Sequence, residues 1–166
     1  MRDQQVLEHG LQGVHEWIRS ADQKAVALLT MLGFLVALLA PYALHFADRP
    51  VAAPVLVVAL SSGSVVAFLV SLLGCLLTLY PRVATGNTKV PKPLTFFGYI
   101  ATTKEGGYFA DVNAQSLDAY LDEMIAQTHI SGSIAAIKHR HLKTAVVALG
   151  VALALAVLAL VAAAVC

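Results

Sequence analysis

The sequence predicts an all-α integral membrane protein with three transmembrane helices, and two observations carry this prediction. First, 58% of the 166 residues are apolar and only 13% are charged, whereas about 25% of the residues in a typical soluble domain are charged. Second, three long blocks contain no Asp, Glu, Lys or Arg: Ala25–Phe46, Val51–Tyr80 and Thr144–Cys166. Because a chain of this length cannot enclose so much apolar surface in one core, the surplus is expected to face lipid.

Each block is long enough to cross a bilayer as a helix. The blocks contain 22, 30 and 23 residues, and a helix needs roughly 20 residues to cross a hydrocarbon core of about 30 Å. In the second block Pro54 suits a first helical turn, whereas Pro41 predicts a kink or an early end of the first helix. We therefore predict transmembrane helices at 25–46, 54–80 and 144–166.

The distribution of Lys and Arg predicts how the chain crosses the membrane. Three of these residues lie in 1–24, one lies in 47–53 and seven lie in 81–143. Since basic segments stay in the cytoplasm, residues 1–24 and 81–143 are expected inside, with 47–53 as a short periplasmic turn. The N-terminus is then cytoplasmic and the third helix ends outside.

Both cytoplasmic segments carry amphipathic helical patterns that lead into a span. Apolar residues recur every three or four positions from Leu7 to Ala25, which predicts a helix continuous with the first span. This helix is either an interfacial anchor or a partner-binding element. Tyr80–Pro81 ends the second helix, and Gly106–Gly107 predicts a turn. A second amphipathic helix is expected from about Asn113 into the third span, with Asp111, Asn113 and Ser116 as alternative caps.

No constellation of residues points to catalysis. The sequence has no phosphate-binding loop, no H-E-x-x-H and no C-x-x-C motif. His139 and His141 point about 200° apart on a helix and so cannot hold one metal ion. We therefore predict no enzymatic activity, no metal and no resident cofactor, and the net charge of +1 gives no attraction to a nucleic-acid polymer. The basic cluster Lys138–Lys143 is read as a cytoplasmic flank of the third span, with lipid or phosphate binding as the alternative.

Aromatic and basic residues gather in the connector before the second amphipathic helix. Their rings can stack on a nucleobase and their cations can bind a phosphate, or the rings can simply pack the connector onto neighbouring helices and the bilayer. The candidates for nucleotide contact are Phe96, Phe97, Tyr99, Lys104 and Tyr108.

Two further features concern the membrane helices. Asp22 lies at the start of the first span, where a carboxylate needs a partner, and Arg19, Lys24 or a base near Lys138 can supply one. The pair would serve as a structural cap or as part of a switch. A row of small residues four apart also runs along the second span, and such a row marks either a helix-packing or oligomer interface or the chance outcome of an Ala-rich composition. The row consists of Gly63, Ala67, Ser71 and Cys75.

Several motifs together resemble a known family. They are the stretch from Trp17 to Ala25, which opens directly into a span, Tyr80-Pro81-Arg82 after the second span, Phe97–Ala101, and Ser133–Lys138 before the third span. The residues that carry the resemblance include Trp17, Arg19, Asp22, Lys24, Tyr80, Arg82 and Lys138. From about residue 5 to residue 160 the chain resembles the transmembrane effectors of Pycsar, the pyrimidine-cyclase anti-phage systems of bacteria.

The resemblance implies a function in the bacterial inner membrane. A partner cyclase would make cyclic CMP or cyclic UMP on infection, and the effector would respond by impairing the membrane and causing abortive infection. Because 1–24 and 81–143 are too short for a separate cyclic-nucleotide-binding β-roll, a nucleotide site would be built from the cytoplasmic helices and the aromatic connector, between subunits of a homo-oligomer. The alternative function is a small structural or assembly subunit of a larger membrane complex without ligand gating. A phage holin is a third possibility, although holins usually end in a charged cytoplasmic tail, which this chain does not have.

Overall fold

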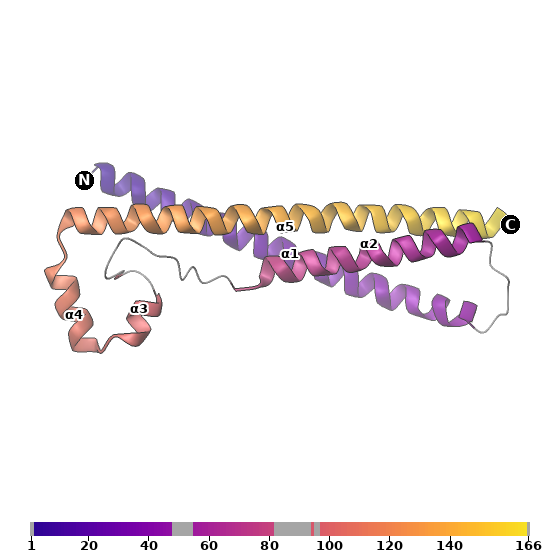
Figure 1. Ribbon diagram of the computed structural model, residues 1–166, viewed down its shortest axis with the longest axis horizontal. Coiled ribbons are helices and arrows are strands. Elements are labelled where there is room, and N and C mark those ends of the chain that lie inside the picture. Colours follow the sequence, from indigo (N-terminus) through magenta and orange to yellow (C-terminus); the bar gives the residue numbers. More distant parts are fainter. Residues whose placement is uncertain (1, 48–54, 82–93, 95–96, 166) are drawn as a thin grey trace. The chain divides into compact units, whose positions relative to one another are not determined.

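The part of the chain that the structure describes folds into five helices. The computed structural model describes the backbone of residues 2–47, 55–81, 94 and 97–165, and side chains within 5–37, 55–81, 94 and 99–164. The described residues form helices and no strand. In chain order the helices are α1 (Arg2–Ala47), α2 (Val55–Leu79), α3 (Phe97–Thr102), α4 (Glu105–Ala114) and α5 (Leu117–Val165) (Figure 1).

Helices α1, α2 and α5 are each long and apolar enough to cross a membrane. The predicted fold class, an all-α membrane protein with three spanning helices, is therefore confirmed. Many large apolar side chains on α2 and on the second half of α5 are exposed, as expected of helices whose outer faces contact lipid. The direction in which the helices cross the membrane stays a prediction.

The two amphipathic segments are continuous with their spans, as the apolar periodicity predicts. Helix α1 runs for 46 residues and α5 for 49 residues. The expectation that α1 ends early at Pro41 is wrong, because the helix continues to Ala47. A proline removes one backbone hydrogen bond, and membrane helices tolerate this loss because neighbouring groups and small local adjustments of the helix satisfy the freed carbonyl.

The chain divides into two compact units. The membrane unit consists of residues 19–81 and 136–166, and the head unit consists of residues 1–18 and 82–135. Helices α1 and α5 therefore contribute to both units, whereas α2 lies in the membrane unit and α3 and α4 lie in the head unit.

The core of the membrane unit is made by all three of its helices. Leu32 of α1, Cys75 of α2, and Ala145 and Leu149 of α5 form one buried cluster. A second buried cluster contains Ala21, Ala25 and Leu142, with Leu28 and Leu79 packed against it. Figure 1 shows α2 lying alongside the second half of α5. Small side chains at these contacts let the helix backbones approach closely.

The head unit contains two short helices that the sequence pattern does not predict. The expected turn at Gly106–Gly107 is wrong, because both glycines lie at the start of α4. Glycine costs about 1 kcal/mol in a helix interior. These two glycines lie in the first turn instead, where the backbone N–H groups have no acceptor within the helix. The carboxylate of Glu105 in the same turn complements the helix dipole. The second amphipathic helix begins at Leu117 and not near Asn113. Of the three alternative caps, Ser116 is the residue used, since its hydroxyl accepts from the Ala119 amide at 3.2 Å.

Candidate functional site

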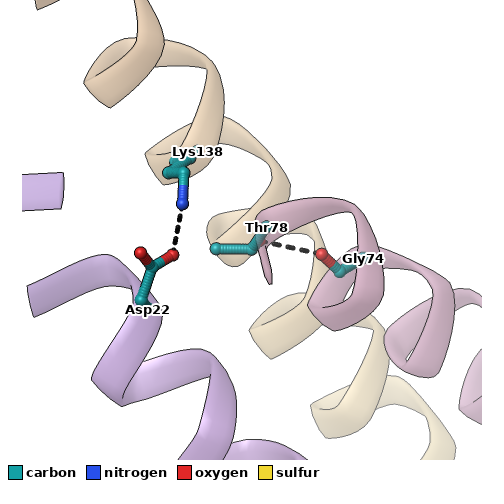
Figure 2. Close-up of polar contacts among 4 residues, drawn as sticks. All are labelled: Asp22, Gly74, Thr78 and Lys138. Atoms are coloured by element: carbon teal, nitrogen blue, oxygen red, sulfur yellow. Dashed lines mark hydrogen bonds and ion pairs between the residues drawn. The ribbon is translucent and has the colours of Figure 1, made fainter. Parts of the chain in front are cut away.

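A partly buried ion pair joins α1 to α5 within the membrane unit. The Nζ of Lys138 lies 2.5 Å from the Oδ1 of Asp22 and donates to it, and Figure 2 shows the two side chains pointing toward one another. The Lys138 side chain is 7% exposed and that of Asp22 is 35% exposed. Of the candidate partners that the sequence predicts for Asp22, Lys138 is the one that forms the ion pair, whereas Arg19 and Lys24 are exposed.

The pair adjoins the apolar core of the membrane unit. Ala21, next to Asp22 in sequence, is fully buried in a cluster with Leu142, one turn beyond Lys138. In such surroundings an isolated charge is costly, and a hydrogen-bonded partner of opposite sign offsets much of that cost. The pair is therefore a contact that specifies how α1 and α5 pack, and it depends on both side chains.

Among the described residues, the others that carry the family resemblance are exposed. Trp17 is 64% exposed and Tyr80, directly after α2, is 66% exposed. Arg82 lies outside the described residues. The structure thus brings Asp22 and Lys138 into contact and leaves Trp17, Arg19, Lys24 and Tyr80 on the surface of their units.

Helices α2 and α5 are in close backbone contact. A Cβ built on Gly74 would lie 3.0 Å from the Cβ of Ala145 and 3.1 Å from the carbonyl oxygen of His141. Two hydroxyls reach across the same interface: the Oγ of Ser71 donates to the Ala145 carbonyl at 2.8 Å, and the Oγ of Ser64 donates to the Ala152 carbonyl at 2.8 Å. Within α2, buried Thr78 donates to the Gly74 carbonyl at 2.8 Å (Figure 2).

The predicted row of small residues contributes to this same-chain contact. A Cβ on Gly63 would lie 3.2 Å from Cδ1 of Leu155. Ser71 and Cys75 are buried, whereas Ala67 is only partly covered. Sequence reasoning missed Gly74 and Thr78. For Thr78 a sequence signal is available, because Ser64, Ser71 and Thr78 recur every seven residues. A seven-residue repeat keeps one face of a helix against its neighbour.

In the head unit, one tyrosine hydroxyl joins α3 to α4 and another joins α4 to Leu94. The Tyr99 hydroxyl of α3 donates to Oδ2 of Asp111 of α4 at 2.5 Å. The Tyr108 hydroxyl of α4 donates to the Leu94 carbonyl at 3.2 Å. Both rings are partly buried, as expected for tyrosines that combine an apolar body with a polar tip. The Tyr99 bond stabilises the packing of α3 against α4.

The candidates for nucleotide contact are distributed over this part of the head unit. Phe96 lies outside the described residues, and Phe97 is the first residue of α3 with its side chain outside them. Tyr99 and Tyr108 make the contacts given above. Lys104 is exposed directly before α4 and makes no side-chain cap hydrogen bond. Sequence reasoning left Phe109 out of this set, yet its ring is 69% exposed.

A buried carboxylate is the second feature of the head unit that the sequence does not reveal. Glu123 of α5 is 1% exposed and accepts from Nε2 of Gln115 at 3.0 Å. Gln115 directly follows α4, so this bond joins the end of α4 to α5. Among the described residues, no three His, Cys, Asp or Glu side chains are placed to hold a metal ion.

Comparison with known proteins identifies one family. Residues 6–165 match PycTM, described as the Pycsar effector protein domain. The match includes all of the described membrane unit and all of the head unit except the first five residues. No curated protein and no solved structure matches the chain.

Proposed function

Because the chain belongs to the Pycsar effector family, we propose that it responds to cyclic UMP or cyclic CMP made by a partner cyclase and then impairs the bacterial inner membrane. The family places the chain in anti-phage defence as a multi-pass membrane effector that works with a partner cyclase system. The proposal adds the messenger, the inner membrane and the damage that causes abortive infection.

The observation that carries the proposal is that two helices belong to both units. Helices α1 and α5 each contribute one part to the head unit and another to the membrane unit. A ligand that prefers one packing of α1 against α5 in the head unit therefore also favours one arrangement of the same two helices in the membrane unit. Binding shifts the population only by its difference in affinity for the two arrangements. We propose that the favoured arrangement is a leaky homo-oligomer.

A cell experiment tests this function. Cells carrying the protein and a cyclase that makes cyclic UMP or cyclic CMP are expected to take up a membrane-impermeant dye within minutes of induction. Cells carrying the protein with an inactivated cyclase, or with an adenylate cyclase, are expected to exclude it. Unchanged permeability with both pyrimidine nucleotides, in cells shown to contain the protein, contradicts the proposal. A stoichiometric integral-membrane partner that co-purifies with the protein would then favour an assembly subunit.

Within the head unit, we propose that the nucleotide phosphate is bound by Lys104 and the base by aromatic rings of α3 and α4. Replacing Lys104 by glutamine is expected to weaken binding of either cyclic pyrimidine nucleotide about tenfold, because one charge-assisted hydrogen bond is lost. Calorimetric titration of the purified protein measures this change. Since Lys104 makes no cap hydrogen bond, the substitution leaves α4 intact.

The matched control is Lys24→Gln, which removes the same charge from an exposed position in the membrane unit and is expected to leave the Kd unchanged. Equal affinities of the wild type and Lys104→Gln would place the phosphate elsewhere without refuting the response to nucleotide.

A further inference from the structure

The basic cluster at the start of the third span is divided between two faces of α5. Lys138 is buried against Asp22, and Leu142, one turn later, is buried in the core. Arg140 and Lys143 are exposed. Residues three apart on a helix are neighbours, with about 5–6 Å between their Cβ atoms. Two cations therefore lie side by side on the outer face of the helix.

These two cations have no counter-charge within the described membrane unit. Asp22 is the one carboxylate in residues 19–47, 55–81 and 136–165, and Lys138 opposes its charge at 2.5 Å. The outer face of α5 at Arg140 and Lys143 therefore keeps its full positive charge, and it is suited to a ligand that brings negative charge.

An exposed apolar strip continues directly from the two cations. Val147 and Val151 follow Lys143 at successive intervals of four residues and are 59% and 48% exposed. Gly150 lies on the same side, and, apart from its chain neighbours and its own helix backbone, no atom lies within 4 Å of the position that its Cβ would occupy. The strip is therefore apolar, continuous and locally open. A surface with cations at one end and an open apolar strip along the helix matches the shape of a phospholipid.

We propose that this surface binds an anionic phospholipid. We call it the lipid face and define it as Arg140, Lys143, Val147, Gly150 and Val151. The two cations bind the headgroup phosphate, and one acyl chain lies along Val147 and Val151 past Gly150. A zwitterionic lipid carries its own cation beside the phosphate, so it gains less from the two side chains. This inference requires neither a response to nucleotide nor a particular direction of crossing.

Native mass spectrometry of the purified full chain tests the proposal, with phosphatidylglycerol and phosphatidylcholine titrated in separate arms. The double variant Arg140→Gln/Lys143→Gln is expected to bind phosphatidylglycerol about 30-fold more weakly than the wild type, since each cation near an anionic headgroup contributes about fivefold. The matched control, Arg19→Gln/Lys24→Gln, removes the same charge from exposed positions of α1 in the same unit. It is expected to bind as the wild type does.

A second variant separates shape from charge. Gly150→Phe keeps both cations and fills the open position on the strip, so it is expected to weaken phosphatidylglycerol binding several-fold without altering thermal stability. Equal losses in the α5 and α1 double variants would overturn the proposal, because they indicate attraction by net charge alone. Equal binding of the two lipids would overturn it too. Displacement of phosphatidylglycerol by inorganic phosphate or a cyclic nucleotide would identify a soluble phosphate ligand instead.

Discussion

Replacing Asp22 by asparagine is expected to lower the midpoint of thermal unfolding by about 5–10 °C, and by more than Lys138→Met does. The physical reason is the unequal exposure of the two partners. Lys138 is 7% exposed and Asp22 is 35% exposed. Asp22→Asn leaves an ammonium group buried without a counter-charge, which is among the most destabilising changes, at about 3–5 kcal/mol in fully buried pairs. Lys138→Met leaves the Asp22 carboxylate, which water can reach. The methionine side chain fills the volume that the lysine side chain occupied.

The double variant Asp22→Asn/Lys138→Met is the control for this experiment. Because replacing a whole buried pair by uncharged groups is often neutral, it is expected to recover most of the lost stability. Unfolding of the detergent-solubilised protein gives all four midpoints. If Asp22→Asn unfolds within about 1 °C of the wild type, the ion pair does not hold α1 against α5.

Under the proposed function, cells carrying the Asp22→Asn variant are also expected to take up dye without a nucleotide, because the resting packing of α1 against α5 is weakened.

Replacing Gly74 by leucine is expected to destabilise the membrane unit by about 1–3 kcal/mol or more. The new Cβ would lie 3.0 Å from the Cβ and 3.2 Å from the Cα of Ala145, and 3.1 Å from the His141 carbonyl oxygen. None of these atoms can move by rotating a side chain, so α2 and α5 must separate. At Gly63 the nearest atom is the end of the Leu155 side chain, which can turn aside, and the effect of leucine is expected to be smaller.

Gly33→Leu is the matched control, because nothing lies within 4 Å of its Cβ position on α1. Cys75 reports on unfolding directly, since its side chain is fully buried beside Gly74. A thiol-reactive fluorogenic dye in a Cys166→Ser background therefore follows the exposure of α2 with temperature. We expect the order of unfolding midpoints to be Gly33→Leu above Gly63→Leu above Gly74→Leu. Equal midpoints for Gly33→Leu and Gly74→Leu would refute a close contact between α2 and α5.

The sequence predicts the spans well because their signal is local. A charge-free block of more than 20 residues has few alternatives to a membrane helix, and the apolar period of three to four residues predicts that α1 and α5 continue beyond the membrane. The two short helices α3 and α4 are missed because they depend on contacts such as Tyr99 with Asp111, whereas the local pattern at Gly106–Gly107 favours a turn.

The contacts between helices are harder to predict because they join residues far apart in sequence. Asp22 and Lys138 are separated by 116 positions, and nothing local distinguishes Lys138 from the other bases near it. The α2 contact shows a second difficulty. A row at intervals of four drifts around a helix with 3.6 residues per turn, so Gly63, Ala67, Ser71 and Cys75 do not follow one contact line. Gly74, which is not in that row, lies at the contact, since a Cβ there would be 3.0 Å from the Cβ of Ala145.

Release of dye from reconstituted vesicles tests the central claim most directly. The purified protein is incorporated into sealed vesicles of phosphatidylethanolamine and phosphatidylglycerol that contain a self-quenched dye. Addition of cyclic UMP or cyclic CMP is expected to release the dye in proportion to the protein incorporated. Cyclic AMP and protein-free vesicles are expected to give no release. Vesicles that stay sealed with both pyrimidine nucleotides, although they contain folded protein, would contradict a nucleotide-gated membrane effector.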